Sequence, residues 1–428
     1  MSTVAYGRRS ALVIRVRRFL HGVLVMWRRA NRWLFRVRAD RHLAEVLVFA
    51  HAKTDDELGD VVNRLIWGFP PDSGVTLRVV VGPALSGVSI ESLPSPKGQV
   101  RYIASVPHLT LEGRWRIWDL FRADLILTMK FPRPVVAFLP FVVGKLEIAD
   151  PWYYAWTEGN VWKNTYYFTF SEEGRESYDE LSRRNFSRLY EESRDRSESY
   201  CFLTGPSFDE YERFSYGEDS LKVVCNSIIK NDQFLEHIGG PHVLTFADPV
   251  FHFGPSVYAE TFREKAVEVV EKYRCYLVVP QFTVPLMVAR HPSLRDFIIG
   301  IAVKSSGPFN FPTAADLTTL GTTSISTYLM LPVASSLTGR VHFIGADGRK
   351  PDENYFWKHN PQVQYADLME TVFETHPSFF RDRVYADYYD EYCDVFESIV
   401  AFGERQGKEY LSLTDSHIPA LSRRVLGH

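Results

Sequence analysis

Short apolar runs alternate along the chain with stretches in which apolar residues recur at helical spacing. The first set of runs lies at 45–50, 76–82, 100–105, 123–129 and 134–140. Runs that are apolar throughout are typical of strands covered on both faces. Residues 54–69 carry a helical pattern, and Thr54 with Glu57 three positions later forms a capping box at its start. We therefore expect an α/β domain with a mostly parallel, doubly wound sheet over residues 43–148.

The pattern changes in the middle of the chain and then resumes. Residues 149–199 are first strongly aromatic and then dense in both charges, which predicts a solvated helical connector. The aromatic part (150–170) is either packed core or a rim on which a sugar ring stacks. New apolar runs then follow at 201–205, 222–226, 242–248, 275–280, 297–303 and 340–347, with helical patterns at 256–273 and 323–337. These predict a second Rossmann-like, doubly wound α/β domain over 200–428, and a chain of 428 residues is long enough for two cores.

The N-terminal segment, residues 1–42, is strongly basic and has eleven arginines against one acid, Asp40. On a helical wheel one face collects Leu12, Val16, Phe19, Leu20, Val23, Trp27, Ala30 and Leu34, and the opposite face collects Arg17, Arg18, Arg28, Arg29, Arg32 and Arg36. A basic face opposite an aromatic and aliphatic face predicts a helix that lies on an anionic membrane surface, here through residues 8–38. Two alternatives are a helix that docks on the protein's own acidic body and an organelle transit peptide.

The composition of the chain indicates its cellular compartment. The net charge of −3 gives no indication of a nucleic-acid partner. Cys201, Cys225, Cys275 and Cys393 lie far apart, without metal-ligand spacing or a disulfide framework, as in a reduced cytoplasmic protein. No apolar run has the roughly 18–20 residues of a membrane span. We expect a cytoplasmic protein that is peripheral on the inner face of the membrane.

Candidate site residues lie where predicted strands end, because ligands of open α/β sheets bind outside the carboxyl ends of the strands. Glycine lets the backbone approach a ligand closely, and serine hydroxyl and amide N–H groups hold anions. An asparagine amide at a strand end can bind a base or ribose. The candidates are Gly205, Pro206 and Ser207 in one loop, Asn226, Asp248, the helix start Thr323–Ser324, and Asp347 with Arg349 and Lys350. Each of these also has an ordinary structural alternative as a turn or a helix cap.

The set as a whole resembles the bacterial lipooligosaccharide sialyltransferase family. The matching features are Thr204–Ser207, Cys225-Asn226, Gly321–Ser324 with Tyr328, and Gly345-Ala346-Asp347, in the family's order and approximate spacing over about 200–420. The resemblance implies that a cytidine monophosphate (CMP) sugar is the donor and that an acidic sugar, such as sialic acid or a related keto-acid sugar, passes to a glycan or glycolipid acceptor. It implies no cofactor besides this donor substrate.

The chain departs from that family at the proton acceptor. The family's catalytic histidine precedes the last long helix, where residues 385–392 here read YADYYDEY. His359, His376 and Asp387 are therefore the candidates for the general base. The chain also contains no Asp-x-Asp motif, which fits a metal-independent transferase.

Two other functions stay open at this point. The Gly-Pro-Ser loop is also similar to one in the 6-hydroxymethylpterin pyrophosphokinase-like family, whose chemistry would require Mg²⁺, with Asp248 and Asp347 as candidate ligands. The second alternative is a non-catalytic α/β scaffold protein.

Overall fold

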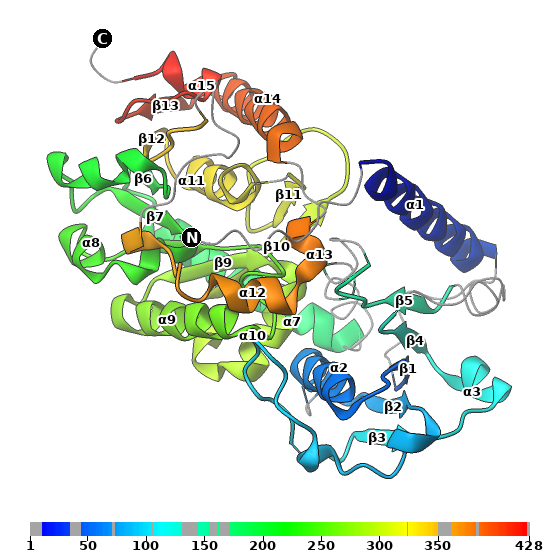
Figure 1. Ribbon diagram of the computed structural model, residues 1–428. Helices are drawn as coiled ribbons and strands as arrows, with labels where there is room; N and C mark the ends of the chain where they lie inside the picture. Colours follow the sequence, from blue (N-terminus) through cyan, green and yellow to red (C-terminus); the bar gives the residue numbers. More distant parts are fainter. Residues whose placement is uncertain are drawn as a thin grey trace. The chain divides into compact units, whose positions relative to one another are not determined.

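Parallel strands form two separate sheets in the computed structural model (Figure 1), which confirms the predicted α/β class. The structure describes residues 11–34, 44–70, 73–104, 106–130, 144–153, 159, 161, 172–322, 324–349, 361–381 and 385–425. The predicted strand at 134–140 and nearly all of the aromatic segment 150–170 lie outside these residues. The chain forms two units, which we call the first unit (Met1–Glu176, Pro249–Glu260 and Leu368–Arg383) and the second unit (Ser177–Asp248, Thr261–Asp367 and Val384–His428).

The sheet of the first unit has five strands in the order β3-β2-β1-β4-β5. Their bounds are β1 Glu45–Phe49, β2 Thr76–Val80, β3 Leu109–Glu112, β4 Leu125–Thr128 and β5 Leu146–Ile148. Three of them coincide with predicted runs, but the prediction of a strand at 100–105 is wrong. The backbone there is satisfied in other ways, since Val100 N–H donates to Pro255 O (3.1 Å) and the Asn63 side chain accepts from Tyr102 N–H (2.6 Å).

The α-helices among the described residues are α1 Ala11–Leu34, α2 Asp55–Gly68, α3 Ile117–Arg122, α7 Glu172–Glu192, α8 Asp232–His237, α9 Val257–Tyr273, α10 Val284–Arg290, α11 Leu331–Leu337, α12 Met369–Thr375, α13 Pro377–Arg381, α14 Tyr385–Glu404 and α15 Pro419–Ser422. Helix α2 begins as predicted, because the Thr54 hydroxyl accepts from Glu57 N–H at 3.3 Å. The Glu57 carboxylate accepts from Lys53 N–H, one residue before the expected partner. Leu58, Val62 and Leu65 then bury one face of α2 against the sheet.

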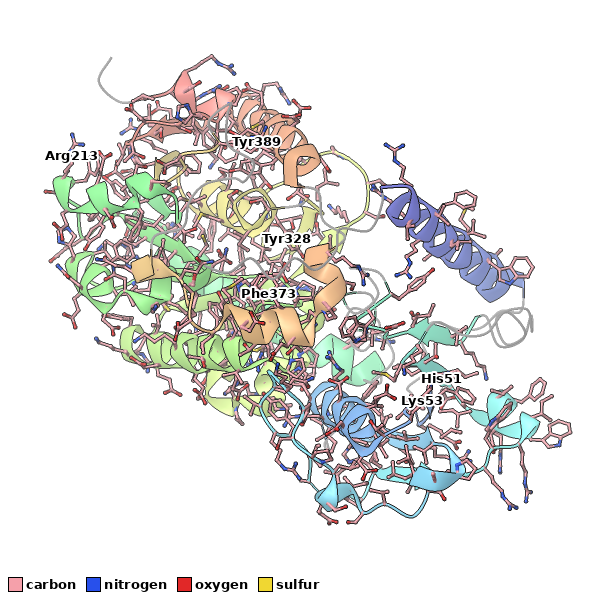
Figure 2. All side chains as sticks on the ribbon, in the orientation of Figure 1. His51, Lys53, Arg213, Tyr328, Phe373 and Tyr389 are labelled. Atoms are coloured by element: carbon pink, nitrogen blue, oxygen red, sulfur yellow. The ribbon has the colours of Figure 1, made fainter. Side chains whose placement is uncertain are left out.

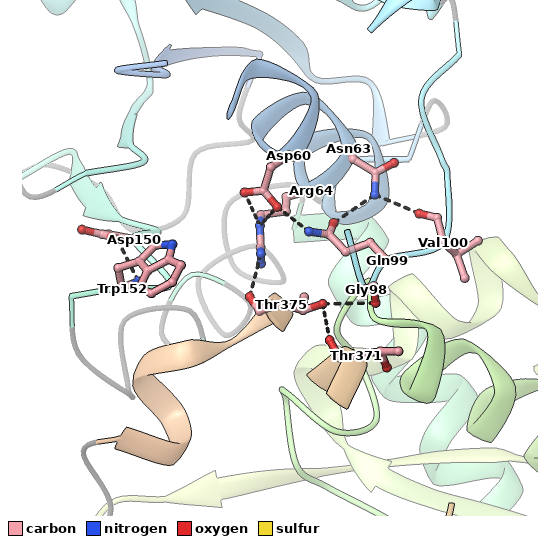
Figure 3. A network of polar contacts seen from close by, with 10 residues as sticks. All are labelled: Asp60, Asn63, Arg64, Gly98, Gln99, Val100, Asp150, Trp152, Thr371 and Thr375. Carbon is pink, nitrogen blue, oxygen red and sulfur yellow. Dashed lines mark hydrogen bonds and ion pairs between the residues drawn. The ribbon is translucent and has the colours of Figure 1, made fainter. Parts of the chain in front are cut away.

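Two distant segments complete the first unit, although the sequence predicted one continuous domain over 200–428. Trp67 of α2 is 1% exposed and donates its indole N–H to Phe253 O at 2.8 Å. Arg64, one turn earlier, donates to Thr375 O at 2.6 Å and pairs with Asp60 at 3.0 Å. Figure 3 shows the adjoining polar network, in which Asn63 donates to Val100 O at 2.9 Å and Thr375 donates to Gly98 O at 3.3 Å. Residues 249–260 and 368–383 therefore belong to the core of this unit.

The sheet of the second unit has eight strands in the order β11-β10-β9-β8-β7-β6-β12-β13, all paired in parallel. Their bounds are β6 Glu198–Phe202, β7 Leu221–Cys225, β8 Val243–Thr245, β9 Tyr276–Pro280, β10 Ile298–Lys304, β11 Thr318–Leu320, β12 Arg340–Ile344 and β13 Glu409–Ser412. Each of the six predicted strands of this half overlaps an observed strand, but β6 begins three residues before the predicted run at 201–205 and ends at Phe202, so that 203–205 belong to a loop. Strands β11 and β13 were not predicted; both are short and lie at the two edges of the sheet.

Helix α7 is not the solvated connector that its charge predicted. Phe186 and Leu189 are each 1% exposed and lie in the core of the second unit. The Asn185 amide donates to Ile298 O at 2.8 Å and to Arg295 O at 3.1 Å. Apolar residues one turn apart thus bury one face of α7, and the charged residues occupy the rest of its surface.

Candidate functional site

The strand order of the second unit reverses between β6 and β12. From β6 the chain runs outward through β7, β8, β9, β10 and β11, and it then returns to place β12 on the other side of β6. This is the topological switch point, where open α/β sheets bind ligands beyond the carboxyl ends of the strands. The loops that leave the two strands are 203–207 and 345–349, and these contain two of the predicted candidate groups.

Glycines let these two loops approach each other closely. Gly205 N–H donates to Gly345 O at 2.9 Å, and Leu203 N–H donates to Ile344 O at 2.8 Å. A Cβ at Gly205 would lie 2.2 Å from Asp347 Oδ2, closer than real Cβ atoms come to other heavy atoms. Gly345 has φ +72°, and its Cβ would lie 2.3 Å from Leu203 O. Only glycine fits at either position without displacement of its neighbours.

Asp347 binds the Ser207 loop directly. Ser207 N–H lies 3.1 Å from both carboxylate oxygens, and the Ser207 hydroxyl donates to Oδ2 at 2.8 Å. Thr414 Oγ1 lies 2.9 Å from Ser207 Oγ and accepts from Gly345 N–H at 3.3 Å. Burial raises the pKa of Asp347, and the hydrogen bonds from Ser207 act in the opposite direction. Pro206 begins the 3₁₀ turn Pro206–Arg213 that follows the loop.

Asn226 follows β7, the neighbour of β6 on the other side. Its backbone is in the left-handed region, with φ +50°. Its Oδ1 is buried and has no hydrogen-bond partner among the described residues. A buried polar atom without a partner has a cost that a bound group can offset. The conformation and the orphaned oxygen single out Asn226 among the predicted binding residues.

Two tyrosines of helix α14 lie beside two further candidates, Arg349 and Ser324. Arg349 N–H donates to Tyr389 Oη at 2.9 Å, and the Arg349 guanidinium lies 5.4 Å from the centre of the Tyr389 ring. Ser324 Oγ lies 3.0 Å from Ser326 Oγ, which donates to Tyr392 Oη at 3.3 Å. Figure 2 labels Tyr389 and also Tyr328, which lies in the π-helical turn Ser326–Met330. This turn packs against β7 and α14.

The other predicted residues are not brought together here. Asp248 is partly exposed and follows β8 by three residues. His376 belongs to the first unit and is 1% exposed, with its backbone N–H bonded to Val372 O at 2.8 Å. Thr323, Lys350 and His359 lie outside the described residues, and so does the side chain of Asp387 in α14.

Sequence reasoning missed Thr414 and the α14 tyrosines. Thr414 follows β13, a strand that was not predicted, although the alternation of apolar and polar residues in LSLT (411–414) is a strand signal. The segment 385–392 that contains Tyr389 and Tyr392 was considered only as the place where the family's histidine is missing. Their spacing of three residues places both on one face of a helix.

The sheet of the first unit has its own switch point, between β1 and β4. His51 follows β1 with φ +52°, and Lys130 follows β4 and donates its Nζ to His51 O at 3.2 Å. Figure 2 labels His51 and Lys53 in this loop. The Lys53 N–H bond and the Lys130 charge lower the pKa of Glu57 at the start of α2.

Within the described parts of the chain, no three or more His, Cys, Asp or Glu side chains gather as a metal site requires. No described helix is long and apolar enough to cross a membrane. Neither a scan of protein-family models nor a search of curated proteins gives a match.

Proposed function

We propose that this protein is a metal-independent glycosyltransferase that moves an acidic sugar from a CMP-sugar donor to a glycan or glycolipid acceptor at a membrane surface. The observation that carries the proposal is the pair of loops at the β6/β12 switch point, where Gly205 and Ser207 contact Gly345 and Asp347. The resemblance to the lipooligosaccharide sialyltransferase family rests on these same motifs. In this proposal the second unit is a Rossmann-like donor domain.

The roles follow from the contacts. Asp347 is a positioning residue, because its carboxylate holds the Ser207 amide and hydroxyl in place. The loop it fixes presents backbone to the phosphate or ribose of the donor. Asn226 offers an amide whose buried oxygen lacks a partner, and a nucleotide amino or hydroxyl group would supply one. Arg349 and Ser324 would bind the phosphate and the sugar carboxylate.

The acceptor proton needs a general base, which we propose among His359, Asp387 and His376. The burial of His376 in the first unit makes it the weakest of the three. Separate alanine substitutions should leave CMP binding intact, and one should abolish transfer. Retention of transfer in all three would exclude the whole set.

Helix α1 would bring the enzyme to its acceptor. On its predicted apolar face Phe19 is 70% exposed and Trp27 47% exposed. Arg17 on the opposite face donates to Tyr153 O at 2.7 Å and lies over the Tyr153 ring. The exposed apolar side chains support a membrane role, whereas the Arg17 contacts are those that the self-docking alternative predicts.

The deciding experiment is the melting temperature of the purified protein with CMP, CDP, UDP, GDP and ATP, each with and without Mg²⁺. Ligand at one hundred times its Kd stabilises the native state by about 2.7 kcal/mol. We expect CMP to raise the melting temperature equally in both conditions. The Ser207→Ala variant should lose most of the shift, whereas Ser187→Ala, on an exposed surface of α7, should keep it. Stabilisation by ATP only with Mg²⁺ would favour the pyrophosphokinase, and no shift with any nucleotide would favour the scaffold.

A further inference from the structure

A second exposed apolar surface surrounds α3 in the first unit. Four large apolar side chains there are exposed: Trp115 (42%), Ile117 (56%), Trp118 (69%) and Phe121 (48%). Arg114, Arg116 and Arg122 lie between and beside them and are exposed as well. We call these seven residues the α3 patch. The predicted membrane segment, residues 8–38, does not include it.

The exposure is fixed by the way α3 is anchored. Leu120 is 2% exposed and packs in a cluster with Leu47, Ile126 and Leu146. Asp119 accepts from Arg116 N–H at 2.6 Å and pairs with Arg78 at 3.2 Å. These two residues occupy the face of α3 that is turned into the unit. The aromatic side chains therefore remain outward without rotation of the helix.

The charges of the α3 patch indicate which kind of partner surface it binds. Asp119 is the only acid from 114 to 122, and it is 8% exposed and already paired. The exposed part of the segment therefore has three positive charges and no negative one. Tryptophan, phenylalanine and arginine are also enriched in protein–protein interfaces, so the composition alone does not choose between a protein and a lipid partner. The three positive charges without an exposed acid among them favour an anionic membrane interface, where rings lie at the headgroup level and cations bind anionic lipid.

We propose that the α3 patch is a second lipid-contacting element that inserts Trp118 and Phe121 into the interface of an anionic bilayer. It rests on the proposed function only for membrane attachment, and it depends neither on glycosyl transfer nor on α1. Its ligand class is the anionic phospholipid surface. Two separate lipid contacts on one unit would hold the unit in a defined orientation on the bilayer, which a single amphipathic helix does not do.

The test is binding of the full-length protein to vesicles of phosphatidylcholine with and without phosphatidylserine. Trp118→Ser/Phe121→Ser should weaken binding about tenfold or more, because binding strength scales with the apolar area buried in the membrane interface and two aromatic rings are lost. Arg114→Gln/Arg116→Gln/Arg122→Gln should lower the phosphatidylserine dependence of binding, and the dependence that is left is due to the arginines of residues 8–38. Tyr190→Ser, an equally exposed aromatic (49%) of the second unit, is the matched control and should bind as the unmodified protein does. Melting temperatures should stay equal across the set.

A second measurement locates the side chain directly. Lipids brominated on the acyl chain quench tryptophans that reach the interface. Trp118→Phe keeps an apolar ring, and the proposal expects it to bind vesicles normally while losing part of the quenching. Unchanged quenching would overturn insertion of Trp118.

Two further outcomes would overturn the proposal. One is unchanged vesicle binding by Trp118→Ser/Phe121→Ser together with complete loss in Phe19→Ser/Trp27→Ser, which would leave α1 as the whole attachment. The other is a dimer of the unmodified protein that becomes monomeric in the α3 variant, which would assign the patch to a second copy of the chain. A failure of CMP to stabilise the protein would contradict the proposed function and leave the α3 patch unaffected.

Discussion

Replacement of Gly205 by alanine tests the close approach of the two switch-point loops. Gly205 has φ −69°, a backbone conformation that alanine adopts freely, so the cost comes only from the added methyl group. That methyl carbon would lie 2.2 Å from Asp347 Oδ2 and 2.5 Å from Gly345 O. Gly345 O cannot move away without breaking a hydrogen bond, because it accepts from Gly205 N–H at 2.9 Å. Asp347 must therefore move, and the bonds from Ser207 must stretch with it.

Two effects contribute to the expected loss of stability in Gly205→Ala. An extra methyl group in a well-packed place costs about 1–3 kcal/mol. A hydrogen bond to a charged acceptor is worth about 1.5–3 kcal/mol, and partial loss of the two from Ser207 adds a fraction of that. We expect the free energy of unfolding to fall by about 2–4 kcal/mol in Gly205→Ala, and the stabilisation by CMP to disappear.

Urea denaturation with and without CMP measures both effects. Gly339→Ala is the matched control, because Gly339 lies one residue before β12 and its methyl group would lie 3.7 Å from the nearest atom, Ser197 O. It should change the free energy of unfolding by no more than about 0.5 kcal/mol. Equal stability of the two variants would refute the loop packing described here. A destabilised Gly205→Ala that still binds CMP with unchanged affinity would show that the paired loops are structural and that the nucleotide binds elsewhere.

Three further predictions concern single side chains. Burial, with the Arg196 and Lys222 charges, lowers the pKa of His242 from 6.5 to about 3. Between these two pH values the imidazole is protonated in the unfolded state and neutral in the folded state. The free energy of unfolding should therefore fall as the pH decreases below 6.5, by about 2 kcal/mol at pH 5. In urea denaturation the His242→Asn variant should not show this decrease in the free energy of unfolding. An equal decrease in the variant would contradict the attribution of the pH dependence to His242. Trp67→Phe removes the indole bond to Phe253 O and should cost about 1–3 kcal/mol by the same method, whereas the exposed Trp118→Phe should be neutral. Asn226→Gly relieves the left-handed backbone and removes the orphaned oxygen, so stability should rise by about 1 kcal/mol while the CMP-induced thermal shift is lost; a full shift would exclude Asn226 from the site.

The sequence predicted the strands of the sheet centres well because those strands are apolar on both faces. β7 is buried at every position, and its run is unmistakable. β3 and β11 are short strands at sheet edges, and each has only one strand neighbour, so their sequences carry a weaker signal. A strand was wrongly predicted at 100–105 because these residues are apolar enough for one. Their backbone N–H groups instead donate to Pro255 O and to the Asn63 side chain.

The candidate site was predictable only as a set of separate loops. Gly205, Ser207 and Asp347 were each identified, and the strand-end rule placed them at one edge of the sheet. The sequence does not show that Asp347 would bind Ser207, because 140 residues separate them and β12 had to be placed beside β6. His376 shows the opposite failure. Its position near the last long helix suggested a base, but the segment that carries it folds into the first unit.

The segments that return to the first unit also set an order of events during synthesis. The chain passes between the units at residues 176, 248, 260, 367 and 383. The first unit therefore lacks part of its core until Leu368–Arg383 has left the ribosome. Trp67 and Arg64 bond to Phe253 O and Thr375 O, which are synthesised some 190 and 310 residues later. A fragment that ends near residue 200 would expose those side chains, and one that begins there would carry two segments without a core to join. Neither half should be expressible as a stable protein, and the cell must complete nearly the whole chain before either unit is secure against proteolysis and aggregation.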